Sequence, residues 1–279
     1  MKSIIITGAS SGIGKAAAIG LVHSGYQVFG LARKYEQLVN LFSELSFPKD
    51  TGDHSYIPIE CDITKQENFD DILNNIINLS SEKTIFGLVN NAGYLEPGAI
   101  EDIEIDNLRA EFETNFFGLV GFTKKVLPVM MSKNEGRIVN VSSISGLVSL
   151  PLLGAYSASK YALEAVSDAL RIELWKTGIK VININPAIID TNLHSVSKEK
   201  IDTLIKKSRL SKAYDKHMSK MPPGLPPSSV AEVIVEAISS GEPKVRYIIG
   251  PKKVKLAIKL RCFIPDKIFF SQVAKRLSS

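Results

Sequence analysis

The first strand and the turn after it decide the fold: residues 3–14 read Ser3-Ile4-Ile5-Ile6-Thr7-Gly8-Ala9-Ser10-Ser11-Gly12-Ile13-Gly14. A β-branched apolar run leads directly into a glycine-rich turn, and residues 15–21 continue with helical spacing. Glycine suits such a turn because it adopts positive φ and lets the backbone approach a pyrophosphate at the positive end of the helix. A glycine triplet alone also occurs in purely structural turns, so its place between the first strand and the first helix is what favours nucleotide binding.

The same alternation continues along most of the chain. We predict helices beginning near residues 12, 35, 67, 105, 155 and 227, and strands at 3–7, 27–32, 55–59, 85–90, 137–142, 180–185 and 247–250. Apolar strands with helices between them are typical of a parallel sheet that is covered on both faces. The pattern predicts an α/β fold of the Rossmann type, doubly wound, with a mainly seven-stranded parallel sheet in a single domain over residues 1–250.

Composition excludes several classes of protein. Of 279 residues, 44% are hydrophobic, which suits a large core, but no apolar run reaches the roughly 18 residues of a transmembrane helix. The two cysteines, Cys61 and Cys262, do not suggest a disulfide framework, and the four histidines show no metal-ligand spacing. We expect a cytoplasmic protein with no secretory signal and no structural metal.

Basic residues are concentrated at one end of the chain. Residues 244–279 contain ten Lys and Arg but a single acid, Asp266, which gives +9, whereas the rest of the chain has 24 basic and 28 acidic residues. The sequence pI of about 9.0 therefore reflects the C-terminal segment, and it does not indicate a nucleic-acid-binding domain.

The regular rhythm breaks once, at residues 191–227. Apolar residues become sparse there, and the stretch closes with Met221-Pro-Pro-Gly-Leu-Pro-Pro227. Long insertions that follow a strand at the ligand-binding edge are usually functional. We expect a mobile substrate lid with helical pieces.

Candidate catalytic residues lie on and before one predicted helix. Tyr156 and Lys160 are four residues apart, on one helical face, and Ser143 precedes Tyr156 by 13 residues at the end of the fifth strand. Ser142 and Ser145 are neighbouring candidates that lack this spacing. A tyrosine with a pKa of about 10 needs a nearby cation, here Lys160, to act as an acid-base group near neutral pH.

With the Thr-Gly-x-x-x-Gly-x-Gly turn at residues 7–14 and Asn90-Asn91-Ala92-Gly93 after the fourth strand, residues 2–250 resemble the short-chain dehydrogenase/reductase family. The resemblance implies that Tyr156 passes its proton to a substrate carbonyl, that Ser143 stabilises the oxyanion, and that Lys160 bonds the nicotinamide ribose. It also implies that Asn115, in Thr114-Asn-Phe-Phe-Gly118, holds a water that connects Lys160 to solvent.

The end of the second strand indicates the cofactor. Arg33 stands where an acidic residue would bind the ribose of NAD, and a guanidinium suits a 2′-phosphate, so we expect NADP(H) in preference to NAD(H). After the sixth strand, Ala187 replaces the glycine that is usual in the family, and a different backbone angle is expected there. By resemblance, the cofactor-binding residues are Gly8, Ser10, Ser11, Gly12, Ile13, Gly14, Arg33, Asp62, Ile63, Asn91, Ala92, Gly93, Tyr156, Lys160, Pro186, Ile189 and Thr191.

The substrate is left open between several classes. The apolar stretch 146–154 and the apolar residues of the C-terminal segment suggest a hydrophobic ketone or aldehyde and its alcohol, and the layout resembles hydroxysteroid and retinol dehydrogenases or enzymes of lipid metabolism. The same residues would equally serve as core. The alternatives are a 3-oxoacyl reductase linked to carrier protein or coenzyme A, and a non-catalytic NADP-binding regulator. We expect a homodimer or homotetramer.

Residues 251–279 form a basic, amphipathic extension. Lysines recur at helical spacing on one face of 252–264, apolar residues gather on another, and Pro265 is expected to end the helix before a second short pattern. In one interpretation the apolar face closes the substrate pocket or packs at a subunit interface. In the other, residues 252–277 make peripheral contact with an anionic membrane.

Overall fold

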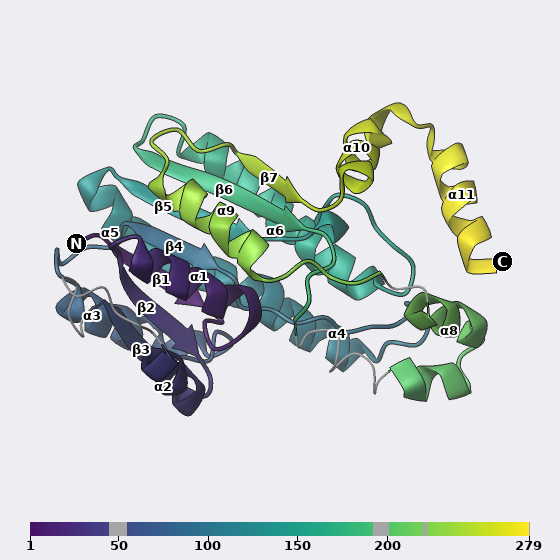
Figure 1. Ribbon diagram of the computed structural model, residues 1–279, viewed down its shortest axis with the longest axis horizontal. Helices are drawn as coiled ribbons and strands as arrows, with labels where there is room; N and C mark the ends of the chain where they lie inside the picture. The colour runs from purple at the N-terminus through teal and green to yellow at the C-terminus, as the bar shows by residue number, and fades with distance from the viewer. Residues whose placement is uncertain (45–54, 192–200, 220–221, 279) are drawn as a thin grey trace.

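A twisted, all-parallel sheet of seven strands forms the middle layer of the molecule (Figure 1). The computed structural model describes residues 1–44, 55–191, 201–219 and 222–278. The strands lie in the order β3-β2-β1-β4-β5-β6-β7, so successive strands are added in one direction up to β3 and in the opposite direction from β4 onward, with the switch between β1 and β4. Their bounds are β1 Ser3–Thr7, β2 Gln27–Ala32, β3 Tyr56–Glu60, β4 Gly87–Asn90, β5 Gly136–Val141, β6 Ile179–Pro186 and β7 Arg246–Ile249.

Helices cover both faces of this sheet. Alternate side chains of β1 show why: Ile4 and Ile6 pack with α1, α2 and α9, whereas Ile5 packs on the opposite face with α3, α5 and α6. The sheet-covering helices are α1 Gly12–His23, α2 Tyr35–Glu44, α3 Phe69–Leu79, α4 Ile105–Phe112, α5 Leu119–Lys133, α6 Gly154–Glu173 and α9 Ser228–Ser239. The predicted doubly wound fold is confirmed, with observed strand ends within two residues of the predicted ones.

The helix predicted from residue 105 is interrupted. Between α4 and α5, residues Glu113–Gly118 form a π-helical turn that contains Asn115. A π-turn inserts one extra residue into the hydrogen-bond ladder and is frequent at functional sites. Here it brings the Asn115 side chain into the interior, where it is fully buried.

The described part of the predicted lid is helical. Residues 201–207 form one helix, and α8, Ser211–Ser219, follows it; residues 192–200 and 220–221 lie outside the described chain. Tyr214 of α8 is buried and donates a hydrogen bond to Asp102, 2.7 Å away. A small core of Ala99, Leu152, Ile201, Ala213 and Tyr214 attaches this segment to the body. Its mobility stays a prediction.

Two helices form the C-terminal extension. They are α10, Lys252–Leu260, and α11, Asp266–Ser278, and a 3-10 turn at Arg261–Phe263 continues α10 almost to the predicted end at Pro265. Figure 1 shows both helices projecting beyond the carboxyl end of β7, with α11 beside α8. No helix in the described ranges is long and apolar enough to span a membrane.

Candidate active site

The predicted site residues on the segments that end or follow strands β1 to β6 lie at one edge of the sheet, because parallel strands end at the same edge. Thr7 at the end of β1 connects the carboxyl ends of β1 and β4 through hydrogen bonds. Its hydroxyl oxygen accepts hydrogen bonds from the backbone N–H groups of Asn91 and Ala92, each at 3.0 Å. The Asn91 amide in turn donates to the carbonyls of Thr7 and Gly8, so the glycine turn is held by the residues that follow β4.

The glycine turn has the positive φ angles and the close backbone approach that are expected of a nucleotide-binding turn. Gly8 and Gly12 have φ of +68° and +54°, and a Cβ on Gly14 would lie 2.2 Å from the Gly8 carbonyl oxygen. Ser11 stands immediately before α1, half-buried Ser10 and Ile13 flank the turn, and the first N–H groups of the helix point toward the sheet edge. These features fit a pyrophosphate, which needs close backbone approach and free N–H donors.

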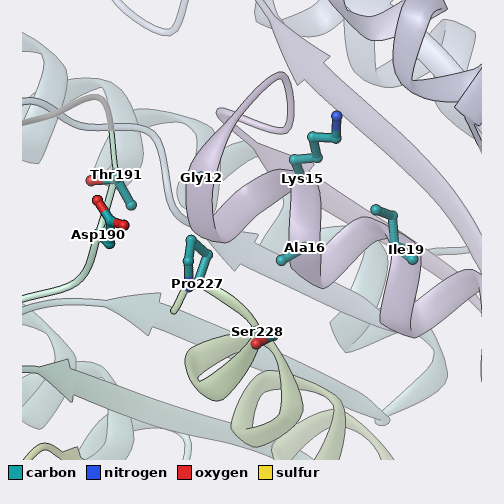
Figure 2. A pocket seen from close by; sticks show the side chains of 8 residues that line it. All are labelled: Gly12, Lys15, Ala16, Ile19, Asp190, Thr191, Pro227 and Ser228. Carbon is teal, nitrogen blue, oxygen red and sulfur yellow. The ribbon is translucent and has the colours of Figure 1, made fainter. Parts of the chain in front are cut away.

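Thr191 faces the glycine turn from the loop after β6. A Cβ added to Gly12 would lie 3.1 Å from the Thr191 methyl group. Figure 2 shows Thr191 and Asp190 on one side of a hollow, with Gly12 and the first turns of α1 opposite and Pro227 and Ser228 below. The hollow measures about 380 Å³.

The loop after β6 is fastened in place. Asp190 N–H donates to the Leu225 carbonyl and Leu225 N–H to the Ile188 carbonyl, which makes a parallel bridge at Ile189. Ala187, which stands in place of the glycine that is usual in the family, has a φ that is not positive, and its N–H continues the pairing with β7 through Ile249. Pro186 ends β6 in the same ladder. Alanine therefore fits at 187 without backbone strain.

Tyr156, Ser143 and Lys160 come together below this edge. Tyr156 lies in the first turn of α6 and is hydrogen-bonded to the Ser143 hydroxyl, which follows β5. The Ser143 oxygen also accepts from the N–H of Ser145 at 3.1 Å, which orients it. Lys160, one turn further along α6, is buried; its Nζ donates to the Val141 carbonyl at 2.9 Å and lies 5.8 Å from the Tyr156 ring centroid.

Burial shifts the pKa values of both Tyr156 and Lys160 away from their ordinary values. Burial raises the pKa of Tyr156 to about 12, although the Ser143 hydrogen bond acts in the opposite direction. Burial also lowers the pKa of Lys160 to about 8, against the charges of Glu111 and Glu164, which raise it. Desolvation is the largest influence on both groups in the cofactor-free protein. The expected lowering of the tyrosine pKa, to which the oxidised nicotinamide ring would also contribute its charge, stays a prediction for the cofactor complex.

Asn115 is held by a closed set of hydrogen bonds. Its amide donates to the Tyr94 carbonyl at 2.8 Å and to the Ser159 hydroxyl at 3.1 Å, and its oxygen accepts from the Tyr94 N–H at 2.9 Å. The space beside Asn115 has no room for a side chain at position 93. A Cβ added to Gly93 would lie 2.9 Å from the Asn115 side-chain oxygen and 3.7 Å from the Lys160 Nζ. Asn115, Gly93 and Lys160 are thus neighbours, as the resemblance implies.

Arg33 and Asp62 lie at the carboxyl ends of the outer strands. Arg33 follows β2 and is exposed. Burial raises the pKa of Asp62, but hydrogen bonds from Thr64 and the charges of Arg33 and Lys65 outweigh it, so that the pKa is lowered overall. Ile63 beside it is buried in the second core. Arg33 is therefore close to Asp62 and open toward the sheet edge.

Sequence reasoning missed Glu111. This carboxylate is fully buried, four residues before Asn115, and its Oε1 accepts from the Glu96 N–H at 3.1 Å and lies 3.5 Å from the Asn115 amide nitrogen. Its charge raises the pKa of both Tyr156 and Lys160. The Glu-x-x-x-Asn spacing is its only signal in the sequence, and such spacing on a helix most often belongs to a solvated face.

Asn185 and Glu164 were also missed. The Asn185 amide in β6 donates to the Ser143 carbonyl at 3.0 Å and to Glu164 Oε1 at 2.6 Å. Glu164 in α6 is itself buried and paired with Arg246. This network connects the serine segment to β6 and α6, and so fixes the backbone of Ser143.

Comparison with known proteins accords with this geometry. The family model described as short chain dehydrogenase matches residues 2–202. The chain belongs to the short-chain dehydrogenase/reductase family. It is therefore an NAD(P)-dependent oxidoreductase that acts on CH–OH groups and their carbonyl counterparts.

Relatives and solved structures of the family cover most of the chain. An "NADPH-dependent 3-dehydrocapnine reductase" of Ornithobacterium rhinotracheale is 34% identical over 291 residues, which cover 99% of this chain and 98% of the relative. A short-chain dehydrogenase from Streptomyces avermitilis superposes with a TM-score of 0.76 at 29% identity, covering 98% and 97% of the two chains. Actinorhodin polyketide ketoreductase with NADPH gives a TM-score of 0.75 at 28% identity, covering 89% and 94%.

Proposed function

We propose that this short-chain dehydrogenase/reductase uses NADP(H) and works in the reductive direction, converting a hydrophobic ketone or aldehyde to its alcohol. The observation that carries the proposal is geometric: Tyr156 is hydrogen-bonded to Ser143 and its ring lies 5.8 Å from the Lys160 Nζ at the nucleotide-binding edge. The raised pKa of Tyr156 agrees with a proton donor, which is the role that reduction requires.

Tyr156, Ser143 and Lys160 have separate roles in the reduction of a carbonyl group. NADPH supplies hydride to the carbonyl carbon when it is bound. Tyr156 gives its proton to the carbonyl oxygen, and the Ser143 hydroxyl donates a hydrogen bond to the same oxygen as negative charge develops on it. Lys160, anchored on the Val141 carbonyl, places a positive charge beside the phenol, and Asn115 is fixed nearby through Tyr94.

Arg33 supports the choice of NADP(H). It is exposed at the end of β2, where the adenine ribose is expected, and no carboxylate precedes it there to bind a ribose hydroxyl. A guanidinium binds phosphate through two parallel hydrogen bonds. The NADPH-dependent relative and the NADPH-bound ketoreductase are consistent with the same cofactor.

The surroundings of Tyr156 support an apolar substrate. Between Ser143 and Tyr156, Leu147, Val148 and Leu153 are half-buried and Leu150 is exposed, while Leu152 belongs to the small core beneath the lid. Apolar side chains in an incompletely covered loop next to a proton donor are suited to a hydrophobic carbonyl compound.

Oxidation of NADPH tests the proposal. We expect the protein to consume NADPH with a hydrophobic ketone or aldehyde from a panel of steroids, retinal, long-chain and short ketones, sugars and a 3-oxoacyl coenzyme A. Arg33→Glu should weaken NADPH binding by roughly ten- to a hundredfold and leave NADH binding unchanged or improved. Equal use of both cofactors by the wild type, or activity restricted to the 3-oxoacyl substrate, would contradict it.

We also propose that the protein is a homodimer or homotetramer. Ile172 and Trp175 at the end of α6 are 74% and 80% exposed, and Phe117 and Tyr161 add further apolar area. Exposed aromatic groups of this kind are enriched at protein interfaces. Sedimentation velocity should give a dimer or larger species, and Trp175→Ser with Ile172→Ser should shift it toward the monomer.

A further inference from the structure

The C-terminal arm, residues 251–278, presents an apolar surface that the rest of the molecule leaves uncovered. Helix α10 faces the body with Val254 and Ile258, which are half-buried, and Ile258 lines a hollow with Leu147 and Ile248. Leu256 and Leu260, on another side of the same helix, are 57% and 45% exposed. The arm therefore packs through one face and exposes a second apolar face.

The turn between the two helices is rigidly built. The Arg261 guanidinium donates to the Ile264 carbonyl at 3.1 Å, pairs with Asp266 at 2.6 Å and lies 4.1 Å from the centre of the Phe269 ring. This clamp uses the single acid of the arm and fixes α11 relative to α10. Phe263 lies outside the clamp and is 78% exposed, and Phe270, whose ring centroid lies 5.6 Å from the guanidinium carbon, is still 57% exposed.

Lysines surround these apolar side chains. Along α10, Lys253 lies on one side of Leu256 and Leu260, and Lys252, Lys255 and Lys259 lie on the other. Lys267 and Lys275 continue the series along α11. All six are exposed, and none has an ion-pair partner within the described part of the chain. The arm is thus basic and apolar on the same outward surface.

We propose that the arm docks this protein on a membrane surface that contains anionic lipid. Phe263, Leu260 and Phe270 would insert shallowly between headgroups, and the lysines would lie at the level of the phosphates. A second copy of the chain fits this surface less well, because the centre of a protein interface is depleted of lysine, and the remainder of the molecule carries only a small net negative charge.

Docking through the arm would also bring the lid close to the bilayer. Helix α11 contacts α8, which is part of the predicted lid at residues 191–227. A hydrophobic compound leaving the membrane would then meet the protein at this side. The docking itself does not depend on the reaction, and its test needs no substrate.

Sedimentation with vesicles tests the proposal on the full-length protein. We expect binding to vesicles of phosphatidylcholine mixed equally with phosphatidylglycerol, little binding to phosphatidylcholine alone, and release from the mixed vesicles at high salt. Lys252→Gln with Lys255→Gln and Lys259→Gln should lower the partition coefficient roughly a hundredfold. Lys124→Gln, Lys133→Gln and Lys176→Gln, which remove the same charge from exposed positions on the body, should change it much less.

A second pair of variants tests how much the exposed apolar side chains of the arm contribute to vesicle binding. Phe263→Ser with Phe270→Ser should lower binding at least tenfold at constant charge, and Leu79→Ser, at an exposed apolar position on the body, should not. Thermal unfolding that matches the wild type shows that each variant is folded. Absence of salt-sensitive vesicle binding, equal losses in the body controls, or an arm variant that only changes a monomer-to-oligomer equilibrium would overturn the proposal.

Discussion

Tyr156→Phe removes one oxygen atom and with it the proton donor. We expect turnover to fall at least a hundredfold, because positioned acid-base groups typically contribute 10² to 10⁴. NADPH affinity and thermal unfolding should stay close to the wild type, since the ring remains in the first turn of α6. Steady-state NADPH oxidation and a fluorescence titration with NADPH measure the two quantities. A variant that retains more than about a hundredth of the turnover would exclude Tyr156 as the donor.

Glu111→Gln tests the buried carboxylate. With a Tyr156 pKa of about 12, the first group to titrate above neutral pH is Lys160, at about 8, so reduction should slow as the pH rises through that value. Glu111 raises the Lys160 pKa, and glutamine keeps the acceptor for the Glu96 N–H without the charge. The alkaline decline of kcat/KM should therefore move roughly one pH unit lower.

The control for this variant lies on the same stretch of helix. Glu113 is exposed, so Glu113→Gln should leave the pH profile where it is. If the Glu111→Gln profile also remained in place, the carboxylate would not act on the site through Lys160.

Some residues of the candidate site could be assigned from the sequence, and others could not. Tyr156, Lys160 and Ser143 could be assigned because three fixed spacings had to coincide after a glycine turn, and the structure brings all three together. Glu111 could not, because only the π-turn that contains Asn115 and the packing of α4 on α6 bury it. The raised pKa of Tyr156 in the cofactor-free protein could not be predicted either, because sequence spacing gives the distance to a cation but not the depth of burial.

At the scale of an element, Gly14→Ala tests the glycine turn. The new Cβ would lie 2.2 Å from the Gly8 carbonyl and 2.6 Å from the Asn91 amide nitrogen, both of which are fixed by hydrogen bonds. We expect a loss of about 1–3 kcal/mol in the free energy of unfolding and a weaker NADPH complex. Gly241→Ala, where nothing lies within 4 Å of the added Cβ, should change neither. Chemical denaturation and NADPH titration compare the two variants, and identical behaviour would refute the close approach at Gly14.

The elements themselves follow from local pattern where one periodicity is uninterrupted. Strands β1 and β2 have their predicted bounds because apolar β-branched runs end there at glycine or charged residues. The interruption between α4 and α5 was not foreseen, since it arises from the tertiary contacts of Asn115 with Tyr94 and Ser159 and not from a helix breaker. At the C-terminus, Pro265 marks the break between helices, as expected, but α10 loosens into a 3-10 turn at Arg261.

Over the whole molecule, charge and packing divide the chain in the same place. Residues 1–243 carry 24 basic and 28 acidic residues, whereas the arm carries eight basic residues and one acid. The three hydrophobic clusters lie within residues 1–250, and Tyr247 and Ile249 of β7 are their last members along the chain. Within residues 251–275 no side chain belongs to those clusters. The sheet and its helices hold the site without the arm.

Removal of residues 251–279 tests this division. We expect the truncated protein to fold, with a Tm within about 5 °C of the wild type, because little buried apolar area is lost. NADPH affinity should be unchanged, since the glycine turn and Arg33 lie at the other end of the sheet edge. With a short ketone kcat/KM should be retained, whereas with a long apolar ketone it should fall, because α11 packs on α8, which is part of the predicted lid. Assays in lipid-free buffer separate this effect from membrane docking, and full activity on the long ketone would show that the arm takes no part in closing the substrate site.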